Sequence, residues 1–273
     1  MTRRLVPPIE TKPPATSKPS GTPSVNSCER CGRPLALMSF EVCGQRFVLR
    51  PACECRLCEQ VERERRARLE HLSRSLRRQG LEDGRYAGMR LDTWCGRDAC
   101  AEAAMTRLRS YLTEVRRGTR NWLYLYGGYG LGKTHLGVAA LKHLCLDRRW
   151  ESLLLRWSQY CSRIQQSWHD PDAASESQLW GRAAESDLLV CDDIDKRGAS
   201  EWALGKLFEL IDHRYLRQLP TVLIANRSLE ALPAFWNRND PMRDLATAIV
   251  SRIVGQLAAA IEFAGPDRRF PPP

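Results

Sequence analysis

Gly-Gly-Tyr-Gly-Leu-Gly-Lys-Thr, at residues 127–134, matches the pattern G-x-x-x-x-G-K-T of a phosphate-binding loop. An apolar run at 122–126 precedes it and predicts a strand, and the run at 135–144 predicts a helix. In this context the glycines let backbone N–H groups point at phosphate oxygens, and the helix N-terminus adds partial positive charge. A glycine-rich turn without a ligand is the alternative. The complete spacing favours a nucleoside triphosphate site.

Each part of the loop has an expected role at that site. Lys133 can reach the β- and γ-phosphates, and the Thr134 hydroxyl can ligate Mg²⁺. The residues expected to contact the nucleotide are Gly127, Gly128, Tyr129, Gly130, Leu131, Gly132, Lys133, Thr134 and His135.

The composition limits the possible classes of protein. A chain of 273 residues can hold one substantial domain and a smaller one. Its net charge of +10 suggests an acidic partner, with nucleic acid first among the candidates. No apolar stretch is long enough to span a bilayer, and the proline-rich start does not resemble a signal peptide. We therefore expect no membrane association, a cytoplasmic location, and eleven cysteines that bind metal or stay reduced.

Changes in composition divide the chain into segments. We expect a disordered proline-rich tail at 1–27, a zinc-binding module at 28–58, a charged helix and linker at 59–84, an ATPase domain at 85–265 and a C-terminal tail at 266–273. Strands are expected at 122–126, 152–156, 187–191 and 220–225, and helices at 99–116, 133–146, 158–168 and 201–218. This alternation predicts an α/β fold with a central parallel sheet flanked by helices.

Polar side chains follow two of the expected strands. Asp192 and Asp193 come at the end of the run 188–191, where Asp192 would hold Mg²⁺ through water and Asp193 would polarise the attacking water. Asn226 follows the run 221–225 and could bind the attacking water or the γ-phosphate. The alternatives are a strand that leaves the core at two acids and an ordinary turn-forming asparagine.

These motifs follow the order of one family. The run 130–136, the Asp192-Asp193 pair, the run 221–229 and Ser251-Arg252-Ile253 together resemble the AAA+ ATPases of the DnaC/DnaI helicase-loader group. They are also similar to the IstB transposition ATPases, and the resemblance covers about residues 85–269.

The resemblance implies a role for each motif in an AAA+ P-loop NTPase. It implies Walker A at Lys133 and Thr134, Walker B at Asp192 and Asp193, sensor 1 at Asn226 and an arginine finger at Arg252. Such a finger stabilises charge on the phosphoryl group of a neighbouring subunit. A surface arginine on a helix is the alternative for Arg252. Many AAA+ proteins have Glu where this chain has Asp193, so slow hydrolysis is expected.

Six cysteines lie close together near the N-terminus, at 28, 31, 43, 53, 55 and 58. Zn²⁺ prefers four thiolate or imidazole ligands, and Cys28-x-x-Cys31 presents two at a suitable spacing. Resemblance to helicase loaders favours Cys53 and Cys55 as the other pair, although Cys58 could replace Cys55 and Cys43 could be a spare or a ligand. Reduced cysteines in a poorly ordered linker are the alternative. The scattered cysteines are expected to be packing residues: Cys95, Cys100, Cys145, Cys161 and Cys191.

The resemblance implies an ATP-dependent replication protein that loads a DnaB-type replicative helicase onto single-stranded DNA. ATP, Mg²⁺ and structural Zn²⁺ would be its cofactors, and the ATP-bound chain would form a homo-oligomer. Trp157, Tyr160 and Trp168 would stack on bases or pack in the core. One alternative is an IstB-like regulator that acts with a transposase on duplex DNA. The other is a zinc-domain adaptor that binds nucleotide without hydrolysing it.

Overall fold

The computed structural model describes ten ranges of the chain: 27–28, 30–35, 38–42, 45–49, 53–96, 98–118, 120–170, 172–196, 200–237 and 240–269. Residues 1–26 of the expected tail, Cys43 and residues 270–273 lie outside them. The chain divides into two compact units, residues 1–67 and residues 68–273. Among the helices of the described ranges, none is long and apolar enough to cross a membrane.

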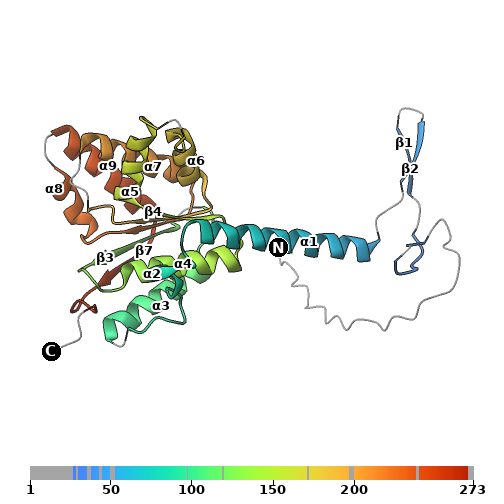
Figure 1. Ribbon diagram of the computed structural model, residues 1–273, viewed down its shortest axis with the longest axis horizontal. Helices are drawn as coiled ribbons and strands as arrows, with labels where there is room; N and C mark the ends of the chain where they lie inside the picture. Colours follow the sequence, from blue (N-terminus) through green and yellow to red (C-terminus); the bar gives the residue numbers. More distant parts are fainter. Residues whose placement is uncertain are drawn as a thin grey trace. The chain divides into compact units, whose positions relative to one another are not determined.

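The first unit contains a two-stranded antiparallel sheet and the beginning of a long helix. Strand β1 (Met38–Val42) pairs with β2 (Gln45–Leu49). Helix α1 (Glu54–Arg78) begins five residues before the expected position 59 and continues into the second unit (Figure 1). Glu54 in the first turn of α1 suits the positive end of the helix dipole. Cys55 and Cys58 therefore lie on a helix rather than before one.

A five-stranded parallel sheet forms the centre of the second unit, with the strand order β4-β5-β6-β3-β7. The strands are β4 (Ser152–Arg156), β5 (Leu188–Asp192), β6 (Thr221–Ile224), β3 (Trp122–Gly127) and β7 (Leu257–Phe263). Strands β3, β4, β5 and β6 match the predicted strands to within one residue at every end. Strand β7 was not predicted, because its Leu-Ala-Ala-Ala run has high helix propensity. Pairing with β3 overrides that preference.

Helices cover both faces of this sheet (Figure 1). The longer ones are α3 (Ala99–Glu114), α4 (Lys133–Asp147), α5 (Trp157–Ser167), α6 (Glu176–Glu185), α7 (Glu201–Leu216) and α9 (Asp240–Gln256). The short ones are α2 (Gly84–Ala87), α8 (Leu232–Trp236) and the 3-10 turn Leu229–Ala231. The sequence predicted α3, α4, α5 and α7, whereas α6 and α9 were not identified.

Two apolar cores result, one on each face of the sheet. Along β3, the alternate residues Trp122 and Tyr124 enter the core that contains α5, α6, α7 and α9. Leu123 and Leu125 enter the other core, with side chains from α1, α3 and α4. Strict alternation between two buried faces is typical of a central parallel strand.

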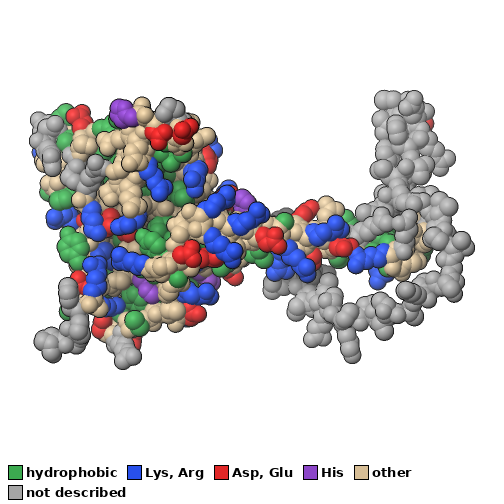
Figure 2. Space-filling model, in the orientation of Figure 1, with side chains coloured by type: hydrophobic (Ala, Val, Ile, Leu, Met, Phe, Trp, Pro, Cys, Tyr) green, Lys and Arg blue, Asp and Glu red, His purple; other side chains and the backbone are tan. Residues whose placement is uncertain are grey.

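The scattered cysteines and aromatic residues do not all pack in these cores. Cys145, Cys161 and Cys191 are buried, as expected. Cys95 is exposed and Cys100 partly exposed, so the packing interpretation is wrong for Cys95, which lies in the surface loop before α3. Trp157 and Tyr160 are buried, whereas Trp168 is 51% exposed. Lys and Arg side chains are mixed with acidic ones over the visible face of the second unit (Figure 2).

Candidate nucleotide-binding site

The glycine loop connects the end of β3 to the first residue of α4. Gly127, Gly130 and Gly132 have φ angles of 132°, 72° and 96°, in the region that favours glycine. A Cβ atom at Gly132 would lie 2.5 Å from the Trp94 ring, and one at Gly127 would lie 2.0 Å from the Phe263 carbonyl oxygen. Side chains at these positions would therefore change the loop.

Lys133 points back across the loop. Its ammonium donates to the carbonyl oxygens of Gly127 (2.8 Å) and Gly128 (2.5 Å) and to Asn226 Oδ1 (3.1 Å). Burial lowers the pKa of Lys133, and the carboxylates of Asp195 and Asp192 oppose this shift. A buried cation beside the loop glycines is placed to meet the phosphates of a bound nucleotide.

Thr134 and Asp192 lie together beside Lys133. The Thr134 hydroxyl donates to Asp192 Oδ2 at 3.1 Å, and its distance to Asp192 Oδ1 is 3.3 Å. Burial, followed by the neighbouring Asp193 carboxylate, raises the pKa of Asp192 to about 6. A hydroxyl and a carboxylate at this distance are oxygen ligands of the kind that Mg²⁺ prefers.

Asp193 differs from Asp192 in both backbone and partner. Its φ angle of 61° is in the left-handed region, which a non-glycine residue adopts only when its surroundings hold it there. Its carboxylate accepts from Lys196 Nζ at 2.8 Å. The left-handed backbone at Asp193 thus ends the extended conformation of β5, and an ion pair with Lys196 holds the Asp193 carboxylate.

Asp195 is a site residue that the sequence analysis left without a role. It is buried, and its two carboxylate oxygens accept from the backbone N–H (2.8 Å) and the side-chain Nδ2 (3.2 Å) of Asn226. This pairing leaves Asn226 Oδ1 directed at Lys133. Neighbouring parallel strands end at the same edge of a sheet, so an acid after β5 and an amide after β6 could have been expected to meet.

The remaining residues of the loop differ in exposure. Tyr129 is 62% exposed, whereas Leu131 is 2% exposed and packs in the core. His135 lies within 3.0 Å of the Arg90 carbonyl oxygen, and its ring meets the Trp94 ring edge to face. Of these three side chains, only that of Tyr129 is largely open to solvent.

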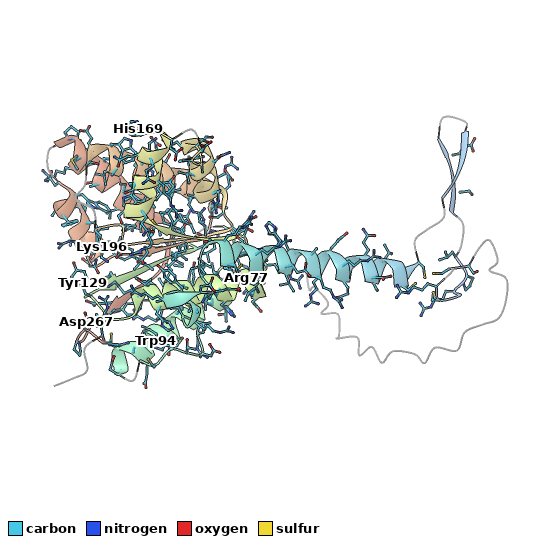
Figure 3. All side chains as sticks on the ribbon, viewed as in Figure 1. Arg77, Trp94, Tyr129, His169, Lys196 and Asp267 are labelled. Atoms are coloured by element: carbon cyan, nitrogen blue, oxygen red, sulfur yellow. The ribbon has the colours of Figure 1, made fainter. Side chains whose placement is uncertain are left out.

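Two segments outside the motif also pack on the loop, and Figure 3 labels Trp94, Tyr129 and Asp267 on one side of this unit. The Arg268 N–H donates to the Gly130 carbonyl oxygen at 3.3 Å, and the Asp267 carboxylate lies against Gly130. Arg268 also pairs with Asp98 at 2.6 Å. No motif in the sequence indicates this contact, because residues 94–98 and 267–268 are far from the loop along the chain.

Arg252 lies on α9 and is bound to α7 of its own chain. Its Nε donates to Asp212 Oδ1 at 2.5 Å, and its guanidinium lies 4.5 Å from the centroid of the Phe208 ring. Within the described residues it makes no hydrogen bond to the loop 127–134. The structure therefore separates Arg252 from the group formed by Lys133, Thr134, Asp192 and Asn226.

A second candidate site lies in the first unit, where four cysteine sulfurs converge. The Sγ atoms of Cys28, Cys31, Cys53 and Cys55 all lie within 4.8 Å of one another. The distances from Cys28 to Cys55 and from Cys31 to Cys53 are 3.6 Å and 3.4 Å. Ligands about 2.3 Å from zinc in a tetrahedron are roughly 3.8 Å apart, so this donor set fits structural Zn²⁺.

The local backbone supports this arrangement. Gly32, with a φ angle of 68°, donates its N–H to the Cys28 carbonyl oxygen at 2.8 Å and closes the turn between the first two cysteines. Backbone N–H groups of Cys31 and Arg30 lower the pKa of the Cys28 thiol to about 6, which favours the thiolate. Cys58 is exposed and lies outside the group of four.

A parallel sheet, a phosphate-binding loop at the end of one strand, and acidic and amide side chains at the ends of two other strands define a P-loop nucleotide-binding protein. More specifically, the chain belongs to the family of IstB-like ATP-binding proteins, whose model matches residues 103–269.

Sequence comparison identifies relatives named as replicative helicase loaders. The chain is 27% identical to the loader DnaI of Bacillus subtilis over 168 residues, which cover 60% of this chain and 51% of that protein. It is 25% identical to the loader DnaC of Escherichia coli over 129 residues, which cover 47% of this chain and 51% of DnaC. The chain thus spans about half the length of these curated relatives.

Structure comparison confirms the predicted AAA+ fold. A crystal structure of the DnaC helicase loader superposes with a TM-score of 0.54 at 21% identity, covering 67% of this chain and 100% of that chain. A crystal structure of DnaI gives a TM-score of 0.55 at 22% identity, covering 64% and 90%.

Proposed function

We propose that this protein is an ATP-dependent loader of a DnaB-type replicative helicase. The observation that carries the proposal is the convergence of Lys133, Thr134, Asp192 and Asn226 at one edge of the sheet. The cysteine group in the other unit and the relatives named as helicase loaders support it. A cytoplasmic location agrees with this function.

ATP would bind with its phosphates on the loop 127–134. Lys133 would exchange carbonyl partners for phosphate oxygens, and Thr134 with Asp192 would hold Mg²⁺, which neutralises charge on the β- and γ-phosphates. Asn226, fixed by Asp195, would orient the attacking water. Asp193 would accept a proton from that water.

Slow turnover agrees with the position of Asp193. Its carboxylate is paired with Lys196, and that ion pair must open before the carboxylate can polarise a water molecule. The same observation supports the adaptor alternative, in which nucleotide binds without hydrolysis.

Assembly would complete the site through Arg252. A guanidinium supplied by a neighbouring copy stabilises charge on the transferred phosphoryl group. Arg252 would exchange Asp212 of its own chain for the γ-phosphate of the next copy, so ATP would favour a homo-oligomer.

Zinc would hold the first unit in a shape that docks on the helicase, while the ATPase unit would contact single-stranded DNA. A transposition regulator that acts on duplex DNA is the second candidate, because the family model bears the name of the IstB-like proteins. The relatives named as helicase loaders favour the first candidate.

Nucleotide titration tests the proposed site. We expect wild-type chain to bind MgATP and to hydrolyse it slowly, and Lys133→Ala to lower the affinity for MgATP by about a hundredfold, because a buried cation is lost from the phosphates. Lys206→Ala is the matched control, since Lys206 pairs with Glu176 and Glu209 on the surface. Equal affinity in wild type and Lys133→Ala would contradict the proposed site.

A further inference from the structure

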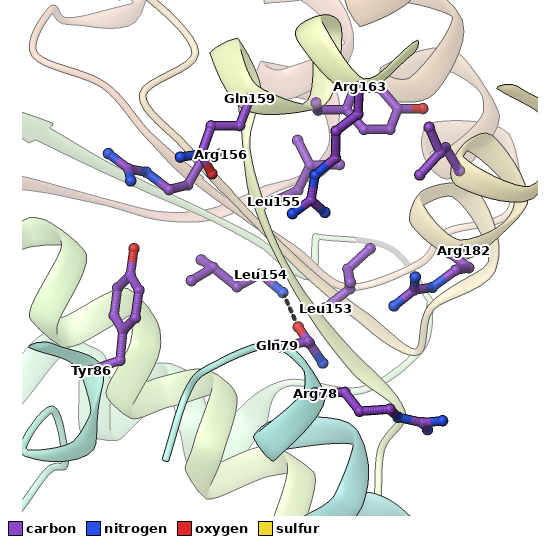
Figure 4. Close-up of a pocket in the computed structure, with 12 residues that line it drawn as sticks. Arg78, Gln79, Tyr86, Leu153, Leu154, Leu155, Arg156, Gln159, Arg163 and Arg182 are labelled. Carbon is purple, nitrogen blue, oxygen red and sulfur yellow. Dashed lines mark hydrogen bonds between the residues drawn. The ribbon is translucent and has the colours of Figure 1, made fainter. Parts of the chain in front are cut away.

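A cavity of about 350 Å³ lies beside β4, the edge strand of the sheet in the second unit (Figure 4). Its walls come from the end of α1, from β4, from α5 and from α6. Four arginines line it: Arg78, Arg156, Arg163 and Arg182. No Asp or Glu is among its described lining residues. Its volume is within the range of small-molecule sites.

The four arginines lack anionic partners in the cavity. None of them makes a hydrogen bond or an ion pair with another residue of the described ranges, in contrast to Arg252 and Arg268. Figure 4 shows Arg163 and Arg182 extending from α5 and α6 toward β4. Like charges around one cavity repel one another, and an anion among them relieves this repulsion.

Polar groups complete the lining. The side-chain amide of Gln79 accepts from the Leu154 N–H (2.9 Å) and donates to the Ser152 carbonyl oxygen (3.0 Å), which fixes α1 against the edge strand. Tyr160 also lines the cavity.

We propose that the cavity is a second phosphate-binding site, for a small ligand with at least two phosphate groups. This site does not depend on the proposed function. The arginines come from four elements around one hollow instead of lying in a row on one surface. This arrangement favours a compact ligand over a continuous nucleic-acid strand.

Calorimetry of the full-length Lys133→Ala protein with inorganic triphosphate tests the site, because this variant is expected to weaken binding at the loop 127–134 about a hundredfold. We expect one remaining site, with an affinity about a hundredfold lower after Arg163→Gln and Arg182→Gln are added. Arg109→Gln with Arg217→Gln is the control, since both arginines are exposed and lie outside the cavity.

Three outcomes would overturn the proposal. The first is no binding of triphosphate to Lys133→Ala, and the second is binding that the Arg163 and Arg182 substitutions do not change. The third is that an oligothymidylate binds in a manner that depends on Arg163 and Arg182 while triphosphate does not, which would assign the cavity to a nucleic-acid strand.

Discussion

Asp192 illustrates how the proposed function conflicts with stability at a single residue. Its carboxyl is buried next to Asp193, and its pKa is raised from 3.8 to about 6. A raised pKa means that the folded chain binds this proton more tightly than the unfolded chain does. As pH rises through about 6, the buried carboxyl of the folded chain loses its proton, and this ionisation lowers the free energy of unfolding. The loss of stability is absent below 3.8, the pKa of the carboxyl in the unfolded chain.

We expect Asp192→Asn to be more stable than wild type at pH 8, by up to about 3 kcal/mol, because the amide carries no buried charge. The gain should shrink as pH falls below 6, and it can be measured by denaturant unfolding at both values. Mg²⁺-dependent nucleotide binding should be lost in the variant. In wild type it should weaken below pH 6, where the carboxyl takes up a proton.

Asp244→Asn is the control for this experiment, since Asp244 is exposed on α9. An Asp192→Asn protein that is less stable than wild type at pH 8 would show that the buried charge has a favourable partner in the folded chain.

Asp195 is expected to act through Asn226. Removal of its carboxylate frees both the backbone N–H and the amide of Asn226, so Asp195→Ala should lower kcat for ATP hydrolysis by about tenfold to a hundredfold. The KM for MgATP should change little. Steady-state kinetics of Asp195→Ala, Asn226→Ala and the double variant measure the effect. If the double variant loses activity equal to the product of the two single losses, Asp195 does not act through Asn226.

At the scale of elements, the group of four cysteines predicts the zinc content of the protein. Metal analysis should find about one zinc per chain, and none after Cys28→Ser with Cys31→Ser, because two thiolates cannot complete a tetrahedral site. Cys58→Ser should keep the metal, since Cys58 is outside the group of four. Wild-type protein without zinc, purified in the absence of chelators, would contradict the zinc assignment.

Elements with a strong local pattern could be predicted from the sequence. The four apolar strands are short apolar runs, and the helix α4 follows directly from the glycine loop. Strand β7 could not be identified, because its alanines favour a helix and only pairing with β3 makes it a strand. The start of α1 was placed too late, because the cysteines suggested a metal-binding loop where the chain is already helical.

The candidate site shows the same limit. The glycine loop, Asp192 and Asn226 each come at the end of an expected strand. Their position at one edge of a parallel sheet could therefore be inferred from the sequence. Trp94 and Asp267 could not, since each reaches the site by a loop path that no motif records. Arg252 was chosen by family order, and its pairing with Asp212 emerges only from the packing of α7 and α9.

At the scale of the whole molecule, one chain carries two units with different proposed tasks. The first unit carries the cysteine group and would dock on the helicase, while the second carries the nucleotide site. A loader of this kind needs both units on one chain, because the nucleotide bound to the second unit must change how tightly the first unit binds the helicase. An adaptor or a transposition regulator would not require the first unit to recognise a helicase.

Transfer of a helicase onto DNA tests this central claim most directly. The replicative helicase encoded in the same genome would be incubated with a single-stranded DNA circle, ATP and this protein, and the fraction of circles that carry helicase would be measured. We predict loading with wild type, and little or none with Lys133→Ala or with Cys28→Ser and Cys31→Ser. If the wild-type chain fails to bind the helicase and instead assembles on duplex DNA in the presence of ATP, the helicase-loader account is wrong.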